Sequence, residues 1–397
     1  MLWIKLRPFT KRPWLNSSNF TYFVKRMAKK PHILIISSWY PSSENANLGN
    51  FVQRQASLLA KEYRVTVLNT IGDSNCKTFI VNEETSSDFK EIVVIHPRSN
   101  SPFIRKKQER EALKKGLNII SQVDLVIGNV ALSKARQFIR AKKHFNCPLI
   151  YIEHGSYFRK EKKKDWSILN RFLFKSLIKN SNKIVAVSEV LKNDMLAYCN
   201  SEIEVIGNHI DENLFSLKDK KKNRTTRFLH VSTLDPATKN PQGIIDSCLA
   251  LHKKGLEFNL TIICDTDYSI WKIKAHESGL ENVIQFVGPI EWKETVNYYH
   301  QSDAFLLFSN YETFSIVLLE ALMTGTPVIT TKVGIAHNFK KNHGIIVETK
   351  NDLTEAMEQF IKAGFTYSPN ALREFGMQYS EEAILSKWKT LIEPHVR

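Results

Sequence analysis

Residues 303–330 read DAFLLFSNYETFSIVLLEALMTGTPVIT, and this stretch decides the fold. The apolar run 303–308 predicts a buried strand, and the polar residues 309–312 predict a loop after it. A helix is expected to begin near Thr313 and to end at Gly325, where Thr-Gly-Thr-Pro stops it just before another apolar run. A strand, a loop, a helix and a second strand in such quick succession are typical of a parallel α/β sheet.

The loop in this segment has the features of an anion-binding site. It follows a parallel strand, and the next helix begins there with free N–H groups and the positive end of its dipole. Glu312 lies in the loop, and Glu320 follows eight residues later, about two turns into the helix. A carboxylate placed there beside a bound diphosphate can accept hydrogen bonds from two ribose hydroxyls. The alternative is structural: Glu312 caps the helix and Glu320 faces solvent.

The same alternation of short β-branched runs and helical patterns extends along the chain from residue 32. One series of apolar runs lies between residues 32 and 187, and a second lies between residues 228 and 347. The expected fold class is therefore α/β, with two Rossmann-like, doubly wound domains that are hinged near residues 205–225 and face a central cleft. That cleft is the expected ligand site.

Length and composition exclude several classes of protein. At about 150 residues per domain, 397 residues suggest two or three domains. An apolar fraction of 43% and a charged fraction of 24% exclude wholesale disorder. No stretch approaches the roughly 18 apolar residues that a membrane-spanning helix needs. The five cysteines are scattered and form no CxxC pair, which argues against a disulfide scaffold or a zinc module and fits a reducing compartment.

The formal net charge of +16 is distributed unevenly. Residues 1–26 carry six basic residues and no acid, and residues 101–180 carry nineteen basic residues against six acidic ones. Residues 181–397 have a net charge of −4, from twenty-three basic and twenty-seven acidic residues. The first half is therefore expected to face an anionic partner. Charge alone leaves nucleic acid, a phosphorylated substrate and a membrane surface open.

Six parts of the chain, taken in order, resemble one known enzyme family. They are WYP (39–41) with GNFV (49–52), IVAVS (184–188), VIGNHID (205–211) with Phe215, HVSTLDPATKN (230–240), the E-x7-E motif 312–320, and residues 379–388. Together they resemble the retaining glycosyltransferases of family 4, which are glycosyl transferases group 1 and have the GT-B fold. The resemblance runs from about residue 32 to the C-terminus.

The resemblance implies a role for each candidate site residue. Glu312 would contact the donor sugar, Glu320 the ribose hydroxyls and Lys239 the diphosphate, where negative charge builds as the sugar leaves. His154 resembles a histidine that touches the transferred sugar, so Glu312 and His154 are the candidate catalytic residues. The remaining donor-binding candidates are Thr233, Asn310, Thr313, Phe314, Ser315, Ile316 and Gly49. In this set the N–H groups of residues 314–316 would hold phosphate oxygens, and the glycine would let the backbone approach the diphosphate from the other domain.

Structural alternatives remain open for two of these residues, and the chain departs from the family at several points. Lys239 could be a surface lysine at a helix start, and His154 a structural histidine after a strand. Thr233 stands where the family usually has arginine, and Lys239 falls one residue later than usual. The family's GG-x-x-E after the Pro-Val strand is replaced by residues 333–338, without the acid, which leaves the donor sugar open. No Asp-x-Asp or His/Cys cluster suggests a metal, so neither metal nor cofactor is expected.

The expected domains are a basic extension (1–27), an acceptor domain (28–206) joined by a C-terminal helix (380–397), and a nucleotide-sugar donor domain (207–379). The extension lacks the apolar core of a signal peptide. Its aromatic and basic residues favour an interfacial membrane anchor, whereas Met27, just before a strong strand, favours an untranslated segment.

The expected function is transfer of a sugar, with retention, from a nucleotide-sugar donor to a saccharide or lipid-linked saccharide acceptor in surface polysaccharide, lipopolysaccharide or capsule synthesis. We expect a cytoplasmic protein that binds the inner face of an anionic membrane through the lysine clusters of residues 105–164, for which a solvated surface is the alternative. A sugar-nucleotide epimerase of the same fold would need an acid/base set that is not found. A nucleic-acid partner is not expected, because residues 105–143 contain only one aromatic residue, Phe138.

Overall fold

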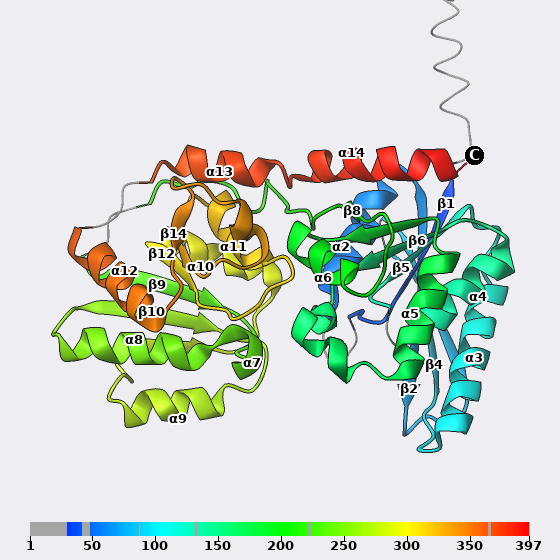
Figure 1. Ribbon diagram of the computed structural model, residues 1–397, viewed down its shortest axis with the longest axis horizontal. Coiled ribbons are helices and arrows are strands. Elements are labelled where there is room, and N and C mark those ends of the chain that lie inside the picture. Colours follow the sequence, from blue (N-terminus) through cyan, green and yellow to red (C-terminus); the bar gives the residue numbers. More distant parts are fainter. Residues whose placement is uncertain are drawn as a thin grey trace, which may run out of the picture.

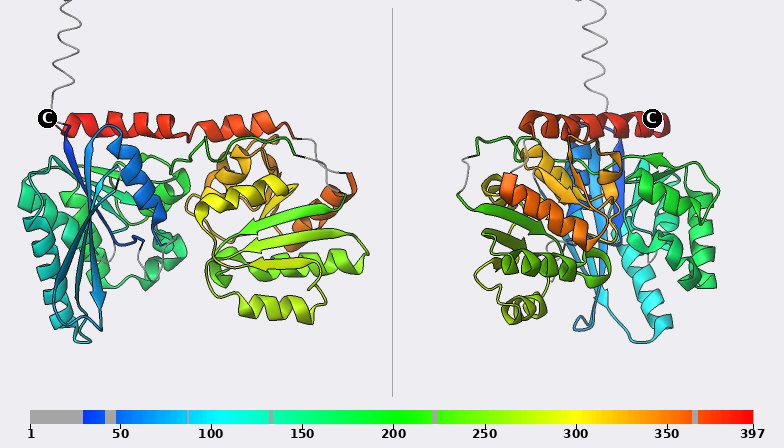
Figure 2. Two further views of the ribbon diagram at one scale, coloured as in Figure 1. Left: turned by 180° about the vertical axis from the view of Figure 1, so that it is seen from behind. Right: turned by 60° about the vertical axis from the view of Figure 1, so that its left-hand side comes forward.

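The computed structural model describes residues 30–41, 48–86, 88–131, 134–220, 224–363 and 367–396. The predicted extension over residues 1–27 lies outside the described residues. Figures 1 and 2 show two lobes, each built around one sheet with helices on both of its faces. Within the described ranges the first sheet has the strand order β3-β4-β2-β1-β5-β6-β7-β8 and the second has the order β11-β10-β9-β12-β13-β14. The predicted fold class, two Rossmann-like doubly wound domains, is confirmed.

In the sheet of the first domain, the first strand in the sequence lies in the middle, and parallel crossovers add later strands on both sides of it. Its strands are β1 (His32–Ser37), β2 (Arg64–Asp73), β3 (Ile80–Thr85), β4 (Lys90–Pro97), β5 (Leu125–Asn129), β6 (Leu149–Glu153), β7 (Lys183–Ala186) and β8 (Glu204–Val205). Its helices are α2 (Asn50–Ala60), α3 (Pro102–Asn118), α4 (Ala135–Phe145), α5 (Ile168–Asn180) and α6 (Glu189–Leu196), with the 3-10 turns η1 (Ser156–Phe158) and η2 (Lys160–Asp165). Strand β3 was not predicted: it pairs antiparallel to β4 at the sheet edge and is exposed along its length, so it has no apolar run.

The second domain is smaller and its described strands all pair in parallel. Its strands are β9 (Thr226–Val231), β10 (Phe258–Ile263), β11 (Ile284–Val287), β12 (Ala304–Leu307), β13 (Val328–Thr330) and β14 (Gly344–Ile346). Its helical elements are α7 (Pro236–Lys239), α8 (Pro241–Lys253), α9 (Ser269–Glu277), η3 (Trp292–Glu294), α10 (Thr295–Gln301), α11 (Ile316–Met323), η4 (Gly334–Asn338) and α12 (Lys350–Ala363). Helix α11 was expected to begin near Thr313 but begins at Ile316, because Ser315 has a φ of 68° and cannot be its first turn.

The chain passes between the domains twice, and the two passes lie side by side. The first follows β8, and the second joins α13 (Pro369–Met377) to α14 (Glu381–Ile392), which continues into η5 (Glu393–His395). Ile210 of the first pass donates its N–H to the carbonyl of Tyr379 in the second, at 3.0 Å. Helix α13 packs on α11, whereas α14 packs on α2 of the first domain with the Trp388 ring buried beneath it. In Figure 1 these two helices form the ridge that spans both lobes.

Arg373 of α13 ties these segments together. Its guanidinium donates to the carbonyls of Glu212 (2.7 Å), Phe215 (2.8 Å) and Met323 (2.9 Å), which lie in the first pass and at the end of α11. A planar guanidinium with five donors can serve several carbonyls at once, which an ammonium on a flexible stem does less well. Arg373 therefore joins α13 to the first pass and to the end of α11 through three backbone acceptors.

Replacement of Arg373 by methionine is predicted to destabilise the protein. The variant leaves buried carbonyls without donors, and each charge-assisted hydrogen bond contributes about 1.5–3 kcal/mol, without additivity. We expect a loss of at least about 2 kcal/mol, seen as a fall of several degrees in the thermal midpoint. The matched control is Lys387→Met on the exposed face of α14, which should leave the midpoint unchanged. Equal midpoints for the two variants would contradict the role of Arg373.

Candidate active site

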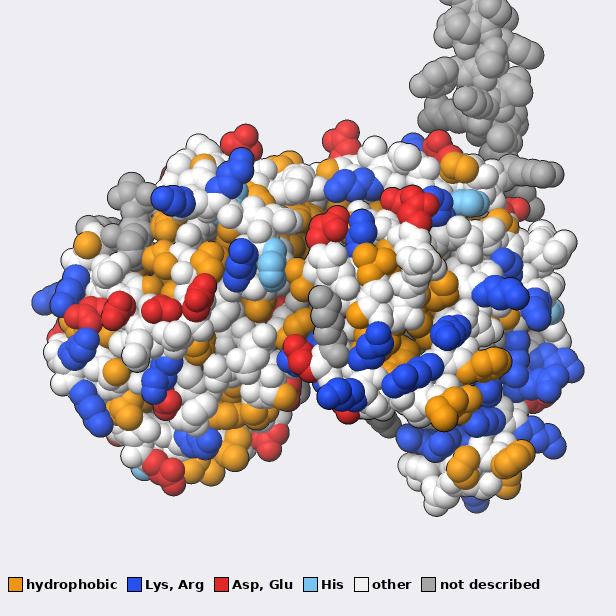
Figure 3. All heavy atoms as spheres, in the orientation of Figure 1, with side chains coloured by type: hydrophobic (Ala, Val, Ile, Leu, Met, Phe, Trp, Pro, Cys, Tyr) orange, Lys and Arg blue, Asp and Glu red, His pale blue; other side chains and the backbone are white. Residues whose placement is uncertain are grey.

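The two domains share a cavity of about 500 Å³ at the carboxyl ends of their central strands. The space-filling view shows the surface hollowed between the two lobes (Figure 3). Nine of the eleven residues chosen from the sequence line the cavity. They are His154, Thr233, Lys239, Glu312, Thr313, Phe314, Ser315, Ile316 and Glu320. The fold thus collects segments that are up to 166 residues apart (154 to 320) around one space.

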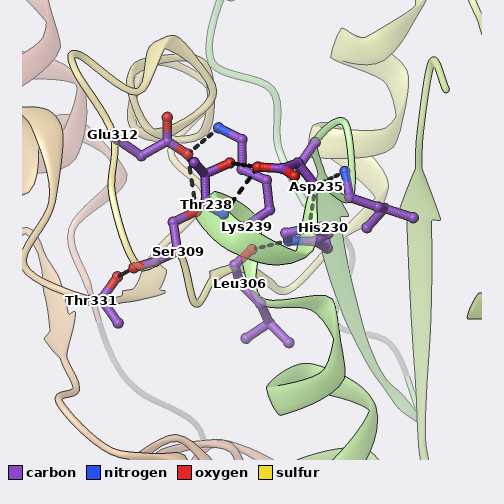
Figure 4. Close-up of polar contacts among 10 residues, drawn as sticks. His230, Asp235, Thr238, Lys239, Leu306, Ser309, Glu312 and Thr331 are labelled. Carbon is purple, nitrogen blue, oxygen red and sulfur yellow. Dashed lines mark hydrogen bonds and ion pairs between the residues drawn. The ribbon is translucent and has the colours of Figure 1, made fainter. Parts of the chain in front are cut away.

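Lys239 and Glu312 form an ion pair at the edge of this cavity, as Figure 4 shows. The Lys239 ammonium lies 2.5 Å from Oε1 of Glu312, and the Ser309 hydroxyl donates to the same oxygen at 2.9 Å. Asp235 caps the short helix α7 by accepting from the N–H of Thr238, which fixes the turn that carries the lysine. Both side chains are mostly buried, so the lysine is not a free surface charge. The carboxylate caps no helix here, because the residue before α11 is Ser315.

Glu320 lies in the second turn of α11 and its side chain is buried, so the solvent-facing alternative is wrong. Oε1 accepts from the Trp292 indole N–H at 2.6 Å, and Oε2 accepts from the Tyr299 hydroxyl at 2.9 Å. Burial raises the pKa of Glu320, whereas the indole, the nearby Arg54 charge and the tyrosine hydroxyl oppose that rise. Each oxygen keeps a lone pair beyond its protein donor, so the carboxylate can accept further hydrogen bonds from a ligand.

Arg54 is a site residue that sequence reasoning missed. It lies on α2 of the first domain, and its guanidinium stacks on the Trp292 ring of the second domain at 4.4 Å. Its Nε and Nη1 atoms are buried and have no hydrogen-bond partner among the described residues. Burial lowers its pKa to about 10, and the charge of Glu320 opposes that shift. A buried cation whose N–H donors have no partner destabilises the folded protein unless a ligand supplies acceptors.

The residues before α11 leave a second unused polar group. The Ser315 hydroxyl is buried and has no partner in the described part of the chain. Its left-handed backbone turns the chain so that α11 opens toward the cavity. Gly334 makes this turn possible: a Cβ there would lie 2.4 Å from the Phe314 carbonyl oxygen and 2.6 Å from the serine hydroxyl. The result is a close-packed helix start with free donors, which suits an anion.

His154 supplies a third unused atom, on the other wall of the cavity. Its ring stacks on Phe51, with centroids 4.2 Å apart, and its Nε2 lies 3.0 Å from Oδ1 of Asn129. The Asn129 amide nitrogen donates to Gln55, and this orientation makes the histidine Nε2 the donor and leaves Nδ1 as an acceptor. That Nδ1 is buried and has no partner among the described residues. Burial lowers the pKa of the ring to about 3, so the ring is neutral near pH 7.

Two residues of the predicted site do not line the cavity. Gly49 has a φ of 72°, and a Cβ there would lie 2.4 Å from the Trp39 carbonyl, so the close approach it permits is to the chain's own backbone. The structure thus gives Gly49 a packing role, and its approach to a diphosphate stays a prediction. Asn310 donates its side-chain amide to the Ala237 carbonyl at 3.3 Å and its N–H to the Thr238 carbonyl at 2.8 Å. It supports the turn that carries Lys239 instead of facing the cavity.

Comparison with known proteins gives two family matches in succession. Residues 48–214 match the family described as Glycosyltransferase Family 4, and residues 211–378 match Glycosyl transferases group 1. The chain is similar to glycogen synthase of Mycobacterium tuberculosis (26% identical over 166 residues, 40% of this chain and 39% of the relative). It is also similar to the O-antigen chain mannosyltransferase RfbU of Salmonella typhimurium (26% identical over 187 residues, 46% of this chain and 51% of the relative). The chain thus spans about two fifths to one half of the length of these relatives.

Solved structures share the fold over nearly the whole chain. Sucrose-phosphate synthase of Thermosynechococcus elongatus superimposes with a TM-score of 0.71 and 18% identity, covering 92% of this chain and 99% of that one. HepE of Anabaena, solved with UDP and glucose, gives a TM-score of 0.68 and 15% identity, covering 92% and 100%. At these identities the likeness concerns the fold. The family matches run together from residue 48 to residue 378, and the chain belongs to the glycosyl transferases group 1, with a first domain of the family 4 type.

Proposed function

We propose that the protein is a retaining glycosyltransferase that moves a sugar from a nucleotide-sugar donor to a saccharide or lipid-linked saccharide acceptor. One observation carries the proposal. Of the five buried side-chain atoms without a partner in the described residues, four belong to Arg54, His154 and Ser315, which all line the cavity. Buried polar groups are almost always satisfied in native proteins, so a concentration of idle ones around one space indicates a polar ligand.

The donor side of this ligand fits a nucleoside diphosphate. The start of α11 with the Ser315 hydroxyl, together with the cations Lys239 and Arg54, surrounds the cavity with donors for phosphate oxygens. Glu320 offers its two remaining lone pairs for ribose hydroxyls, about one helical turn further along α11. HepE, which shares the fold, is a protein solved with UDP, and this supports a nucleotide as the ligand.

The transferred sugar would lie between the two walls. Glu312 and the neutral Nδ1 of His154 are acceptors for sugar hydroxyls, one from each domain. In the proposed reaction the bond from the sugar's anomeric carbon to the phosphate breaks and a bond to the acceptor oxygen forms on the same face. The proton of the acceptor hydroxyl passes to the leaving phosphate. Lys239 and the dipole of α11 stabilise the charge on that phosphate, and the proposal includes no metal or cofactor.

The wider setting follows from relatives and from the surface. RfbU is named as a mannosyltransferase of O-antigen chains, which supports a role in lipopolysaccharide, capsule or other surface polysaccharide synthesis. No described helix is both long enough and apolar enough to span a bilayer. The first domain nevertheless exposes Phe103 (90%) in the first turn of α3, and Ile168 (88%) and Phe172 (65%) in the first two turns of α5. Figure 3 shows Lys and Arg side chains gathered over this domain with hydrophobic side chains between them.

Such a surface matches an anionic bilayer. Each nearby Lys or Arg contributes about 1 kcal/mol of attraction to anionic lipid, and exposed aromatic rings insert among the headgroups. We propose that the protein binds the inner face of the cytoplasmic membrane peripherally, through the first turns of α3 and α5. A lipid-linked acceptor would then be presented to the domain that meets the membrane.

Donor binding tests the proposed function. Wild-type protein is expected to bind UDP or GDP in the micromolar range by calorimetry, and Glu320→Gln should weaken that binding at least tenfold, because the amide replaces one acceptor by a donor. The control is Glu382→Gln on the exposed face of α14. Release of UDP or GDP from a panel of sugar nucleotides then identifies the donor, and the anomeric configuration of the product reports retention. Binding to oligonucleotides alone would contradict the proposal.

The neutral state of His154 gives a prediction about pH. Its folded-state pKa of about 3 lies far below the unfolded value of about 6.5, so the ring does not titrate in the working range. His154→Gln should therefore lower kcat/KM by the same factor at about pH 5.5 and at about pH 8. Below pH 6.5 only the unfolded chain gains a proton at this residue, so the wild type should lose stability on acidification more steeply than the variant.

Two measurements check this, each with the exposed His252 as control. Steady-state kinetics at both pH values should give one ratio between wild type and His154→Gln, and His252→Gln should match the wild type. Urea unfolding at the same pH values should give the variant a smaller loss of stability. A rate defect that vanishes at low pH would show that the ring titrates and would refute the neutral assignment.

Membrane binding is tested by flotation with vesicles. Wild-type protein should float with phosphatidylglycerol vesicles and not with phosphatidylcholine vesicles, and the double variant Phe103→Ser, Phe172→Ser should largely stay in the lower fractions. The matched control replaces Ile270 and Ile273 by serine, since these apolar side chains are also exposed (59% and 57%) but lie on α9 of the second domain. Equal flotation of both double variants would remove the proposed docking surface.

A further inference from the structure

The first domain contains a second cavity, of about 580 Å³, that the proposed donor chemistry does not use. It lies at the carboxyl ends of β2 and β4, below the first turns of α3 and α4. Figure 1 shows these two helices next to each other beside β2 and β4. A cavity of this volume accommodates a sugar with a charged substituent.

Lys134, which precedes α4, places a buried cation in this cavity. Its ammonium donates to Oδ1 of Asn69 at 3.0 Å and to the Thr70 carbonyl at 3.3 Å, and the side chain is only 9% exposed. Both acceptors are neutral, so they give the ammonium hydrogen bonds but no negative charge to compensate its positive charge. Burial lowers the pKa of Lys134 to about 8, and the charge of Glu109 across the cavity opposes that fall. Nearby Gln137 is satisfied by the Thr70 hydroxyl and does not alter the charge.

Two more cations face the same space from other segments. Arg98 follows β4, and Arg105 lies in the first turn of α3. In the described residues neither guanidinium forms an ion pair, and Glu109 is the one acid among the cavity's described lining. Three cations against one carboxylate leave two positive charges unbalanced. Arginine with lysine is the pair that phosphate groups attract most strongly, because the guanidinium binds two oxygens at once.

The second cavity adjoins the first. Ser38 lines this cavity and the next residue, Trp39, lines the cleft. The N–H of Ser38 donates to the carbonyl of Asn129, whose side chain holds His154 in the cleft. The segment just after β1 therefore contributes to the walls of both spaces.

We propose that this second cavity holds a phosphate ester on the acceptor, so that the enzyme's acceptor is a phosphorylated saccharide. The inference rests on the proposed glycosyl transfer. It names the chemistry of the acceptor: a phosphate bound by Arg98, Arg105 and Lys134, with the hydroxyl to be glycosylated reaching past β1 to His154. Two molecules carry this group, a soluble sugar phosphate and a lipid-linked sugar diphosphate.

Calorimetry in the presence of whichever of UDP and GDP the wild type binds, at a saturating concentration that keeps the donor site occupied, separates these sources and tests the site. The probes are glucose 6-phosphate with glucose as its uncharged match, and farnesyl diphosphate with farnesol. At least one phosphorylated probe should bind at least tenfold more tightly than its match. That preference should fall at least tenfold in Lys134→Met and in Arg98→Gln, and should persist in Lys143→Met, which removes an exposed lysine from α4. Binding of either phosphorylated probe alone supports the proposal and identifies the source.

Two results would overturn the proposal. One is equal affinity for the phosphorylated and uncharged probes, and the other is an equal loss of preference in Lys143→Met and in Arg98→Gln. Arg98→Gln keeps the test valid if Lys134→Met does not fold. The Arg98 side chain makes no ion pair among the described residues, so its replacement is expected to leave the fold intact. Binding of UDP and of GDP is measured separately in every variant: absence of both from the wild type would refute the proposed function, while retained nucleotide binding in Lys134→Met assigns the lost preference to the second cavity.

Discussion

The paired crossing between the domains is the constraint on which the site depends. Ile210 and Tyr379 hold the two passes side by side, and Arg373 joins α13 to the first pass and to the end of α11. With the two passes held in this way, the two sheets present their carboxyl edges to each other. One apolar core also runs from the first sheet through Phe215 into the buried face of α11. The cleft is thus a product of chain connectivity: neither sheet edge alone would bring His154 opposite Glu312.

The unsatisfied atoms in the cleft come from both domains, and this sharing has a physical consequence. Arg54 stacks on Trp292, which in turn donates to Glu320, so a cation of the first domain and a carboxylate of the second are joined through one indole. Opening the cleft would expose all three side chains to water and remove their desolvation cost. A ligand that supplies acceptors to the guanidinium removes the same cost while the cleft stays closed, which makes binding and closure mutually favourable.

The sequence predicted the architecture and most of the cleft, because strand, loop and helix signals are local and the carboxyl ends of parallel strands converge. Residues 303–330 were sufficient to place Glu312 and Glu320 on one side of a cavity. Arg54 was missed because a single arginine within a helical pattern looks like a solvent charge, and only the second domain buries it. For Gly49 the sequence indicated a close approach but not which atoms approach, and the structure shows the approach to the Trp39 backbone. The start of α11 was displaced because propensity does not reveal that Ser315 is left-handed.

The Lys239–Glu312 pair shows how the site handles charge before a ligand arrives. A lone lysine in a half-buried cleft would be unfavourable, and the pair neutralises it with a carboxylate that the Ser309 hydroxyl also holds. On the proposed function, a diphosphate takes over the lysine, and the carboxylate turns to the hydroxyls of the sugar attached to that diphosphate. The ion pair is then replaced by two charge-assisted contacts, one from the diphosphate to Lys239 and one from the sugar hydroxyls to Glu312. A nucleotide without its sugar provides a partner only for Lys239. Recognition of the intact donor therefore follows from the pairing itself, because only the complete molecule compensates both partners that it separates.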